Sequence, residues 1–200
     1  YLTSGHALYY VGPDGIIDRI AGSNNSCDGR ELCGDGGPAI DARFNHPWGI
    51  ALGPDSSLYV ADTYGYRVRR IAPDGLVSTV AGNGRYEYGG DGGLATEAGL
   101  HSPFDVALDS AGNLYIGTQG FSSGRIRLVT PDGYISTLAG GGEQCEGGYW
   151  CGEGDLATNV WMGHLRSMAM GPGDTLYVGD NNAAPNNHLV RQLRQTLGDT

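Results

Sequence analysis

The sequence predicts an all-β protein, a β-propeller of four-stranded antiparallel blades, with about three to four blades in its 200 residues. Two observations support this fold class. Short runs in which apolar and polar residues alternate are separated by turn signals, as half-buried antiparallel strands require. The same four-run unit returns every 56 to 62 residues. Such a unit cannot cover both of its faces alone, and four-stranded units packed radially make a propeller.

The clearest unit occupies residues 44–82. It contains four predicted strands, Trp48–Leu52, Ser57–Ala61, Tyr66–Ala72 and Leu76–Ala81. Pro73-Asp74-Gly75 joins the last two: proline presets φ, aspartate bonds to the local backbone, and glycine accepts a positive φ. A second complete blade is predicted over residues 100–140, and partial blades over 1–22 and 163–200, all within one domain spanning 1–200.

The two partial blades supply five further strands, expected at Ala7–Val11, Ile16–Ala21, Arg166–Met170, Thr175–Gly179 and Leu189–Leu193. The total is about 13 strands, and two third strands would compete for one place if the chain ends shared a blade. The segment is therefore not expected to close on itself. We favour part of a larger propeller; the alternative is an assembly in which free edges join neighbouring copies by strand addition.

Alternation within the strands also predicts which side chains are buried. The residues expected between blades are Ile50, Leu52, Val60, Val106, Leu108, Ile116, Met168, Met170 and Val178. First strands are expected to line the central channel. The third-strand arginines Arg67, Arg69, Arg70, Arg125 and Arg127 alternate with apolar residues, so they are expected to face outward.

A glycine-rich linker precedes the second, third and fourth units. It is Gly34-Asp35-Gly36-Gly37-Pro38-Ala39, then Gly90-Asp91-Gly92-Gly93-Leu94-Ala95, and in weaker form Gly152-Glu153-Gly154-Asp155-Leu156-Ala157. A short helical turn is expected after each. The acidic residue is interpreted as a turn or helix-cap residue. A calcium ligand is the alternative, although one carboxylate per loop falls short of the oxygens that calcium requires.

The four cysteines form two similarly spaced pairs at equivalent places, Cys27 with Cys33 and Cys145 with Cys151. We interpret them as two local disulfides, which indicates an oxidising compartment and therefore an extracellular or cell-surface protein. A four-cysteine metal site is the alternative, but the spacing differs from that of zinc ribbons. Asn24-Asn25-Ser26 is a glycosylation sequon, so Asn24 is a candidate glycan acceptor.

The formal net charge of -10 argues against nucleic acid and anionic membrane surfaces as partners. No apolar run approaches the roughly 18 residues of a membrane span, so membrane insertion is not expected. The sequence starts in the middle of a repeat and without a signal peptide, which favours a mature or excised segment.

The combined pattern resembles the NHL repeat. It is carried by Pro47-Trp48-Gly49-Ile50-Ala51-Leu52, Leu58-Tyr59-Val60-Ala61-Asp62-Thr63, Arg67-Val68-Arg69-Arg70-Ile71 and Val77-Ser78-Thr79-Val80-Ala81-Gly82, and covers nearly the whole chain. The linkers and cysteine loops are similar to those of the NHL propeller of teneurins and bacterial YD-repeat proteins. The resemblance implies a propeller, usually six-bladed, that displays loops for binding and in many members is not an enzyme.

Three histidines precede first strands, His46, His101 and His164. In the amidating-lyase branch of the NHL class, channel histidines hold zinc, so these residues are the metal-site alternative. We interpret them as loop residues, because His101 is one position out of alignment and the neighbouring motifs are absent. The spacing suggests no Ser-His-Asp arrangement, and no lysine-bearing phosphate loop is present.

Aromatic residues near Asp and Asn are common at sites that stack sugars or anchor proteins. Those predicted in loops or at loop edges are Tyr64, Tyr66, Tyr86, Tyr88, Phe121, Tyr149 and Trp150; packing over blade edges is the other interpretation. The sequence thus predicts a non-enzymatic extracellular module for adhesion, surface display or assembly. Its expected partner is a protein or glycan at the cell surface, or another copy. No cofactor is expected. The alternative is a metal-dependent propeller lyase or hydrolase with its site in the channel.

Overall fold

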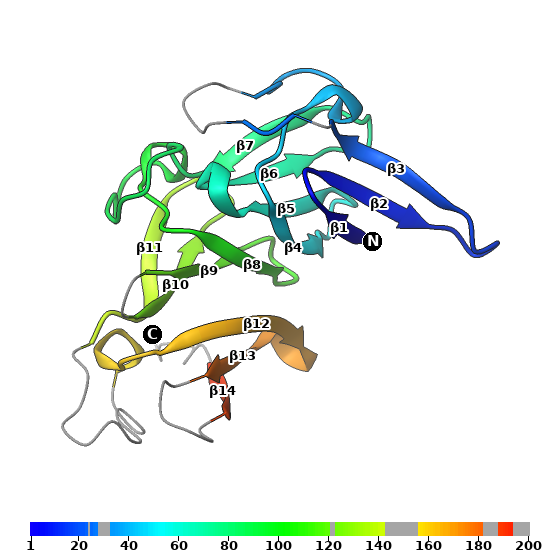
Figure 1. Ribbon diagram of the computed structural model, residues 1–200. Coiled ribbons are helices and arrows are strands. Elements are labelled where there is room, and N and C mark those ends of the chain that lie inside the picture. Colours follow the sequence, from blue (N-terminus) through cyan, green and yellow to red (C-terminus); the bar gives the residue numbers. More distant parts are fainter. Residues whose placement is uncertain (24, 28–32, 121–122, 143–155, 182–187, 194–200) are drawn as a thin grey trace.

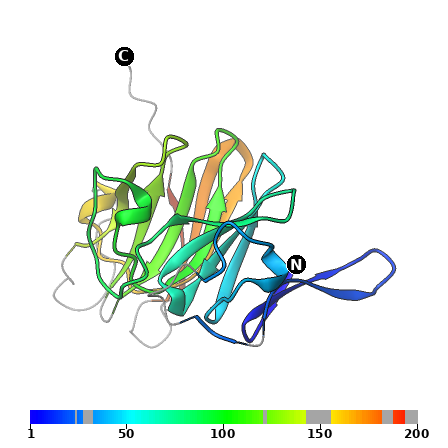
Figure 2. The same ribbon diagram turned by 90° about the horizontal axis from the view of Figure 1, so that it is seen from above.

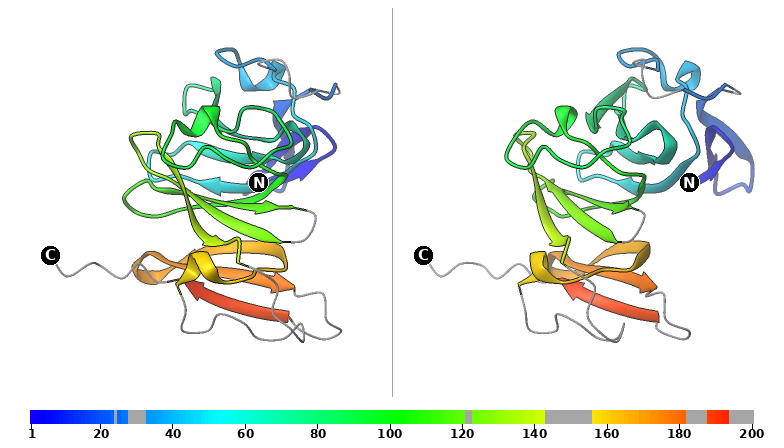
Figure 3. Two further views of the ribbon diagram at one scale, coloured as in Figure 1. Left: turned by 90° about the vertical axis from the view of Figure 1, so that its left-hand side faces the viewer. Right: turned by 60° about the vertical axis from the view of Figure 1, so that its left-hand side comes forward.

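The computed structural model describes residues 1–23, 25–27, 33–120, 123–142, 156–181 and 188–193, with only the backbone of 188 and 189. Within these residues the chain forms four antiparallel sheets (Figure 1). Consecutive strands pair in every sheet, so the topology is a series of meanders. The four sheets lie one beside the next in chain order (Figure 3). The prediction of an all-β fold built from successive antiparallel blades is confirmed.

The first sheet contains β1 (Leu2–Ser4), β2 (Ala7–Val11) and β3 (Ile17–Gly22). The second contains β4 (Pro47–Leu52), β5 (Leu58–Asp62), β6 (Arg67–Ile71) and β7 (Val77–Ala81). The third contains β8 (Pro103–Leu108), β9 (Leu114–Gln119), β10 (Gly124–Val129) and β11 (Ile135–Gly140). The fourth contains β12 (His164–Gly171), β13 (Thr175–Asn181) and β14 (His188–Leu193). The predicted short turns are the 3-10 helices η1 (Ala39–Asp41), η3 (Ala95–Glu97) and η4 (Ala157–Asn159).

Apolar cores fill the spaces between adjacent sheets. Val60, Ile116 and Val178 occupy equivalent places on second strands and are fully enclosed. Val106 and Met168 are also buried, while Ile50, Leu108 and Met170 are partly buried against these cores.

The prediction that Leu52 is buried between blades is wrong, because its side chain is 60% exposed. The equivalent Leu108 packs on the preceding blade. Leu52 instead lies at the far end of β4, whereas β1 reaches the strand near its start, where the Thr3 hydroxyl donates to the carbonyl oxygen of Trp48 at 3.2 Å. The β2–β3 hairpin projects away from the other sheets (Figure 2), so the described residues do not cover Leu52.

The prediction that the third-strand arginines face outward is wrong for Arg67, Arg69 and Arg127, which are buried. Arg69 and Arg127 are 0% and 1% exposed, and Arg67 is also buried. Arg69 forms an ion pair with Asp35, and Arg127 forms the equivalent pair with Asp91. Polar residues at alternate strand positions ordinarily face solvent, but here a linker carboxylate balances the buried charge of Arg69 and another that of Arg127.

The linker aspartates are therefore anchors between linker and blade. Asp35 also accepts a hydrogen bond from the backbone N–H of Thr79 at 3.1 Å, and Asp91 does the same for Thr137 at 3.2 Å. Both aspartates lie in turns, as predicted. No side chain caps η1 or η3, so the alternative helix-cap role is wrong for these two residues.

The first two linkers also cover the outer edges of the blades that follow them. Gly36 donates its N–H to the carbonyl oxygen of Val77 at 2.8 Å, and Val77 donates to Gly37 at 3.0 Å. The second linker repeats this pattern on β11, through Ile135 and the glycines at 92 and 93. Unpaired edge strands invite association with other chains, and these two linkers pair with the edge-facing backbone groups of Val77 on β7 and Ile135 on β11.

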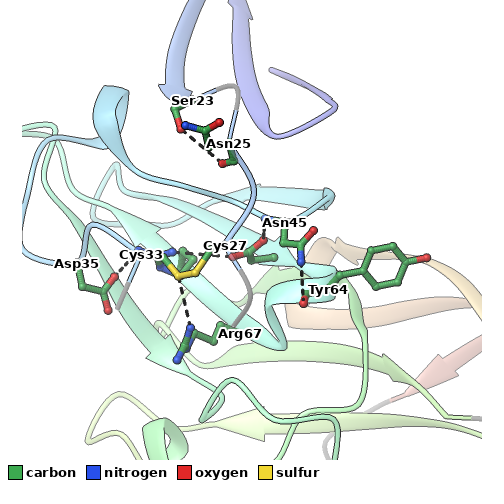
Figure 4. The surroundings of a disulfide bond; sticks show 10 residues. Ser23, Asn25, Cys27, Cys33, Asp35, Asn45, Tyr64 and Arg67 are labelled. Carbon is green, nitrogen blue, oxygen red and sulfur yellow. Dashed lines mark hydrogen bonds and ion pairs between the residues drawn. A yellow bond between two sulfur atoms is a disulfide. The ribbon is translucent and has the colours of Figure 1, made fainter. Parts of the chain in front are cut away.

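A disulfide joins Cys27 to Cys33, with Cα atoms 5.8 Å apart, directly before the first linker (Figure 4). One nitrogen of Arg67 lies 3.9 Å from the Cys33 sulfur, which brings the cysteine loop against the second sheet. Asn24, Cys145 and Cys151 lie outside the described residues, so the second disulfide and the glycan acceptor remain predictions.

Candidate binding surface at the entry rim

The side chains most suited to binding gather at one end of the blades. We call this end the entry rim: here β4, β8 and β12 begin and β5, β9 and β13 end. First strands lie side by side, β4 against β8 and β8 against β12 (Figure 1). Connections at this rim hold both groups of aromatic rings and the two cavities described below.

The first aromatic group is a column of rings between the second and third sheets. The imidazole of His101 is stacked between Tyr86 and Tyr88, with ring centroids 4.0 and 4.1 Å away. Tyr66 contacts Tyr86 at 5.4 Å, and the guanidinium of Arg125 lies 4.2 Å from the Tyr88 ring centroid. Burial, and secondarily the charge of Arg125, lowers the pKa of His101. The column therefore favours a neutral imidazole.

The second aromatic group lies between the first and second sheets. The ring of His46 is perpendicular to that of His6 at 4.7 Å and lies 5.2 Å from that of Tyr64. The side-chain amide of Asn45 donates to the carbonyl oxygen of Tyr64 at 3.2 Å, which ties this loop to η2 (Thr63–Gly65) (Figure 4). Tyr64 is 49% exposed, so this group presents a ring to solvent.

Three equivalent β-bulges shape the rim between these groups. The register shifts between Pro47 and Ile50 on β4, between Pro103 and Asp105 on β8, and between Leu165 and Ser167 on β12. Each bulge places one extra residue on the first strand, and bulges re-aim side chains at strand ends. The bulge residues include Trp48, Phe104 and Arg166, and all three line one cavity of about 270 Å³. We call it the central cavity.

Hydrogen bonds hold the central cavity together. The side-chain oxygen of Gln119 accepts from the backbone N–H of Leu165 at 3.0 Å. Asp105 accepts from the N–H of Met168 at 2.6 Å and from the N–H of Val106 at 3.0 Å. Burial raises the pKa of Asp105, although these bonds oppose the rise. Both side chains thus secure the walls of the cavity.

A smaller cavity of about 190 Å³, the side cavity, lies on the other side of Trp48. Its lining comprises Thr3, Ser4, Gly5, His46, Pro47, Trp48, Thr63 and Tyr64. Trp48 lines both cavities and is 64% exposed, which makes it the most prominent ring of the described rim.

Asp62 is the most perturbed carboxyl group near the rim. It is buried at the end of β5, where it accepts the backbone N–H of Asn45 at 2.6 Å. Burial raises its pKa to about 6, while the Asn45 bond and the charges of Arg69 and Arg67 act in the opposite direction. This carboxyl group therefore titrates near neutral pH while it holds the loop that carries His46.

The structure separates the predicted site residues into different groups. Tyr66, Tyr86 and Tyr88 form the column with His101, whereas Tyr64 lies with His46. His164 instead lines the central cavity. Among the described residues, no group of three or more His, Cys, Asp or Glu side chains is arranged to hold a metal. Phe121, Tyr149 and Trp150 lie outside the described residues.

Trp48, Arg166 and His6 are rim residues that sequence reasoning missed. The repeat pattern predicts ordinary strand positions for Trp48 and Arg166, because alternation alone does not reveal a bulge. The available signal was their shared repeat position, which holds Phe104 in the third sheet. Core positions repeat the same kind of residue, whereas this position changes from indole to phenyl to guanidinium.

Comparisons with known proteins agree with this architecture. A family model described as the teneurin NHL domain matches residues 13–88. Teneurin-m of Drosophila melanogaster is 32% identical over 183 residues, covering 87% of this chain. Teneurin-3 of Danio rerio is 32% identical over 196 residues, covering 90% of this chain. The chain spans only 6% and 7% of the lengths of these two relatives.

A solved structure shares the fold at low sequence identity. An auxiliary nutrient binding protein from Bacteroides thetaiotaomicron superposes with a TM-score of 0.59 and 16% identity, over 88% of this chain and 40% of that one. The sheets, linkers and matches define an NHL-repeat β-propeller. Within that class, the chain is similar to the NHL domain of teneurins. None of its described helices has the length and apolar character needed to cross a membrane.

Proposed function

We propose that this chain is part of a non-enzymatic extracellular module that binds a partner at the cell surface, in adhesion, surface display or assembly. The observation that carries the proposal is the entry rim, where exposed rings stand on a rigid framework of paired strands. Trp48, Tyr64 and Tyr86 are 64%, 49% and 40% exposed. Large rings with a polar end are well suited to anchor partners, because they bury much area at little cost in conformational entropy.

Two further features support this proposal. The disulfide between Cys27 and Cys33 fits an oxidising compartment. The likeness to teneurins favours a part of a large surface protein, because the chain spans less than a tenth of either relative. The partner is a protein or glycan on a facing surface, or another copy of this protein.

The test is a cell-aggregation assay with the full-length protein displayed on otherwise non-adhesive cells. Displaying cells should aggregate with one another or with partner cells, and Tyr64→Ser and Trp48→Ser should reduce aggregation at equal surface expression. Thr96→Ala is a matched control on an exposed position of η3. Unchanged aggregation in both rim variants would contradict a binding role for the rim. Stoichiometric zinc or calcium in the purified protein would instead favour the metal-dependent enzyme.

A further inference from the structure

An indole, a phenyl ring and a guanidinium line the central cavity, and each is carried by the β-bulge of a first strand. The bulges of β4, β8 and β12 bring Trp48, Phe104 and Arg166 to a common lining. Phe104 is 6% exposed, and a side-chain carbon at Gly117 would lie 2.6 Å from the Cε1 atom of its ring. The phenyl ring is therefore packed against β9 as part of the wall, while Trp48 and Arg166 remain exposed.

Arg166 differs from most described arginines in lacking an internal partner. Arg69, Arg70, Arg127 and Arg191 form ion pairs with aspartates, and Arg125 lies over Tyr88. Within the part of the chain that the structure describes, Arg166 has no ion pair and no hydrogen bond. An unpaired guanidinium beside a cavity can bind an external carboxylate through two parallel hydrogen bonds.

The other polar residues of the cavity divide into occupied and available groups. Gln119 and Asp105 already bond to the backbone of β12, so their main role is to hold the wall. His164 lies on the exposed lining near Arg166 in the sequence, and its imidazole can donate to a ligand oxygen. The cavity thus offers a ring face, a cation and an additional polar group.

The size of the cavity limits the ligand. At about 270 Å³ it lies just below the range of drug-sized pockets, which suits one substituted ring better than a folded surface or long chain. The overall negative charge disfavours a long polyanion, because its further charges would meet a repulsive surface. An aromatic ring with polar neighbours matches the apolar face and hydroxyl edge of a sugar.

We propose that the central cavity binds a carboxylated monosaccharide residue of an acidic glycan, with Arg166 paired to the carboxylate and Trp48 against the sugar ring. This proposal rests on the proposed binding function and names one class of ligand for the same rim. The side cavity, on the other side of Trp48, gives the neighbouring sugar residue a place to lie.

The test measures binding of methyl β-D-glucuronide to the purified full-length protein by saturation-transfer NMR titration. Methyl β-D-glucoside is the matched probe, because it has the same ring without the carboxylate. We expect the glucuronide to bind at least about tenfold more tightly than the glucoside, as hydrogen bonds to charged groups allow. Arg166→Gln should remove this preference, and Trp48→Ala should weaken both probes.

Arg85→Gln is the control, because Arg85 is exposed on the loop after β7, outside both cavities, and it should bind both probes like the unchanged protein. Equal binding of the two probes, or a glucuronide preference that survives Arg166→Gln, would overturn the proposal. Tighter binding of N-acetylglutamate than of glucuronide would also overturn it, in favour of an acidic peptide. Aggregation of displaying cells without glucuronide binding would leave the proposed adhesive function intact while rejecting the ligand. Glucuronide binding without aggregation would support the ligand and reject the adhesive role.

Discussion

The carboxylate of Asp105 on β8 accepts a hydrogen bond from the backbone N–H of Met168 on β12, at 2.6 Å. Its second oxygen accepts from the N–H of Val106 at 3.0 Å. A single side chain thus joins the first strands of two sheets at the wall of the central cavity. Because these strands do not pair with each other in one sheet, the bond fixes their spacing where backbone pairing does not.

Asp105→Ala is expected to lower the free energy of unfolding by about 1–3 kcal/mol, because it leaves the N–H of Met168 without its acceptor. Asp105→Asn should retain most of the stability, since the amide oxygen can accept the same bond. Denaturant unfolding of the three proteins measures the difference. Equal stability of the alanine variant and the unchanged protein would show that the bond contributes nothing.

The Asp91–Arg127 pair offers a test of the linker anchor. Asp91→Ala should cost about 2 kcal/mol, because Arg127 is 1% exposed and would keep only carbonyl partners. Asp132→Ala removes a carboxylate on an exposed hairpin turn and is the control. Thermal unfolding of both variants provides the comparison. Similar small losses in the two would indicate that the ion pair does not stabilise the linker.

Asp62 should give the protein a distinct pH dependence. Its pKa rises from 3.8 to about 6 on folding, with burial as the main cause. The folded state therefore holds the proton more tightly than the unfolded state, so this group's contribution to stability is greatest below about pH 4 and declines as the pH rises to about 6. The decline amounts to roughly 2–3 kcal/mol.

Asp62→Asn should remove this decline. Urea unfolding at pH 4, 5, 6 and 7 measures the difference in stability between variant and unchanged protein, which should shift in favour of the variant up to about pH 6 and then level off. Parallel stability profiles would argue that Asp62 titrates at its ordinary pKa in the folded protein.

Gly49 marks a close approach between β4 and β8. A side-chain carbon there would lie 2.6 Å from the Cα atom of Asp105, so Gly49→Ala should force the strands apart and cost about 2 kcal/mol or more. Gly75→Ala is a matched control, because Gly75 has φ 81° and no neighbouring atom within 4 Å of the added carbon. It isolates the backbone strain of about 1 kcal/mol. A smaller loss at Gly49 than at Gly75 would contradict the close approach.

The cysteine pairs provide a covalent test. Non-reducing peptide mapping of secreted protein should recover Cys27 linked to Cys33 and Cys145 linked to Cys151. Equivalent loops of the same spacing support both local pairs. Free thiols at all four positions, or links between the two loops, would exclude this arrangement and reopen the choice of compartment.

The repeated strands could be predicted because their signals are local. Val60, Ile116 and Val178 stand in the same pattern of neighbours and occupy the same core place. Leu52 has the same local pattern as Leu108, but its exposure depends on what lies against the sheet. Local alternation contains no information about that neighbour.

The buried arginines and the central cavity were not predictable for related reasons. The burial of Arg69 depends on Asp35, which is distant in sequence and belongs to a linker that alternation does not describe. The convergence of Trp48 and Arg166 depends on bulges. Each bulge adds one residue to the strand and so changes which side chains point to each face of the sheet. The sequence predicted aromatic residues at loops, but not which of them share a cavity.

The linkers that cover β7 and β11 also affect the order in which each blade is assembled during synthesis. Residues 34–39 leave the ribosome before the strand whose edge they cover, so β7 enters between β6 and a segment already made. Once that blade is complete, hydrogen bonds to β7 hold residues 34–39, which connect the blade to the preceding sheet. A pull on the N-terminal side would act along this connection and meet the hydrogen bonds of the linker before those inside the blade. Blades fastened in this way share tension along the chain, a property that the proposed adhesive function would use.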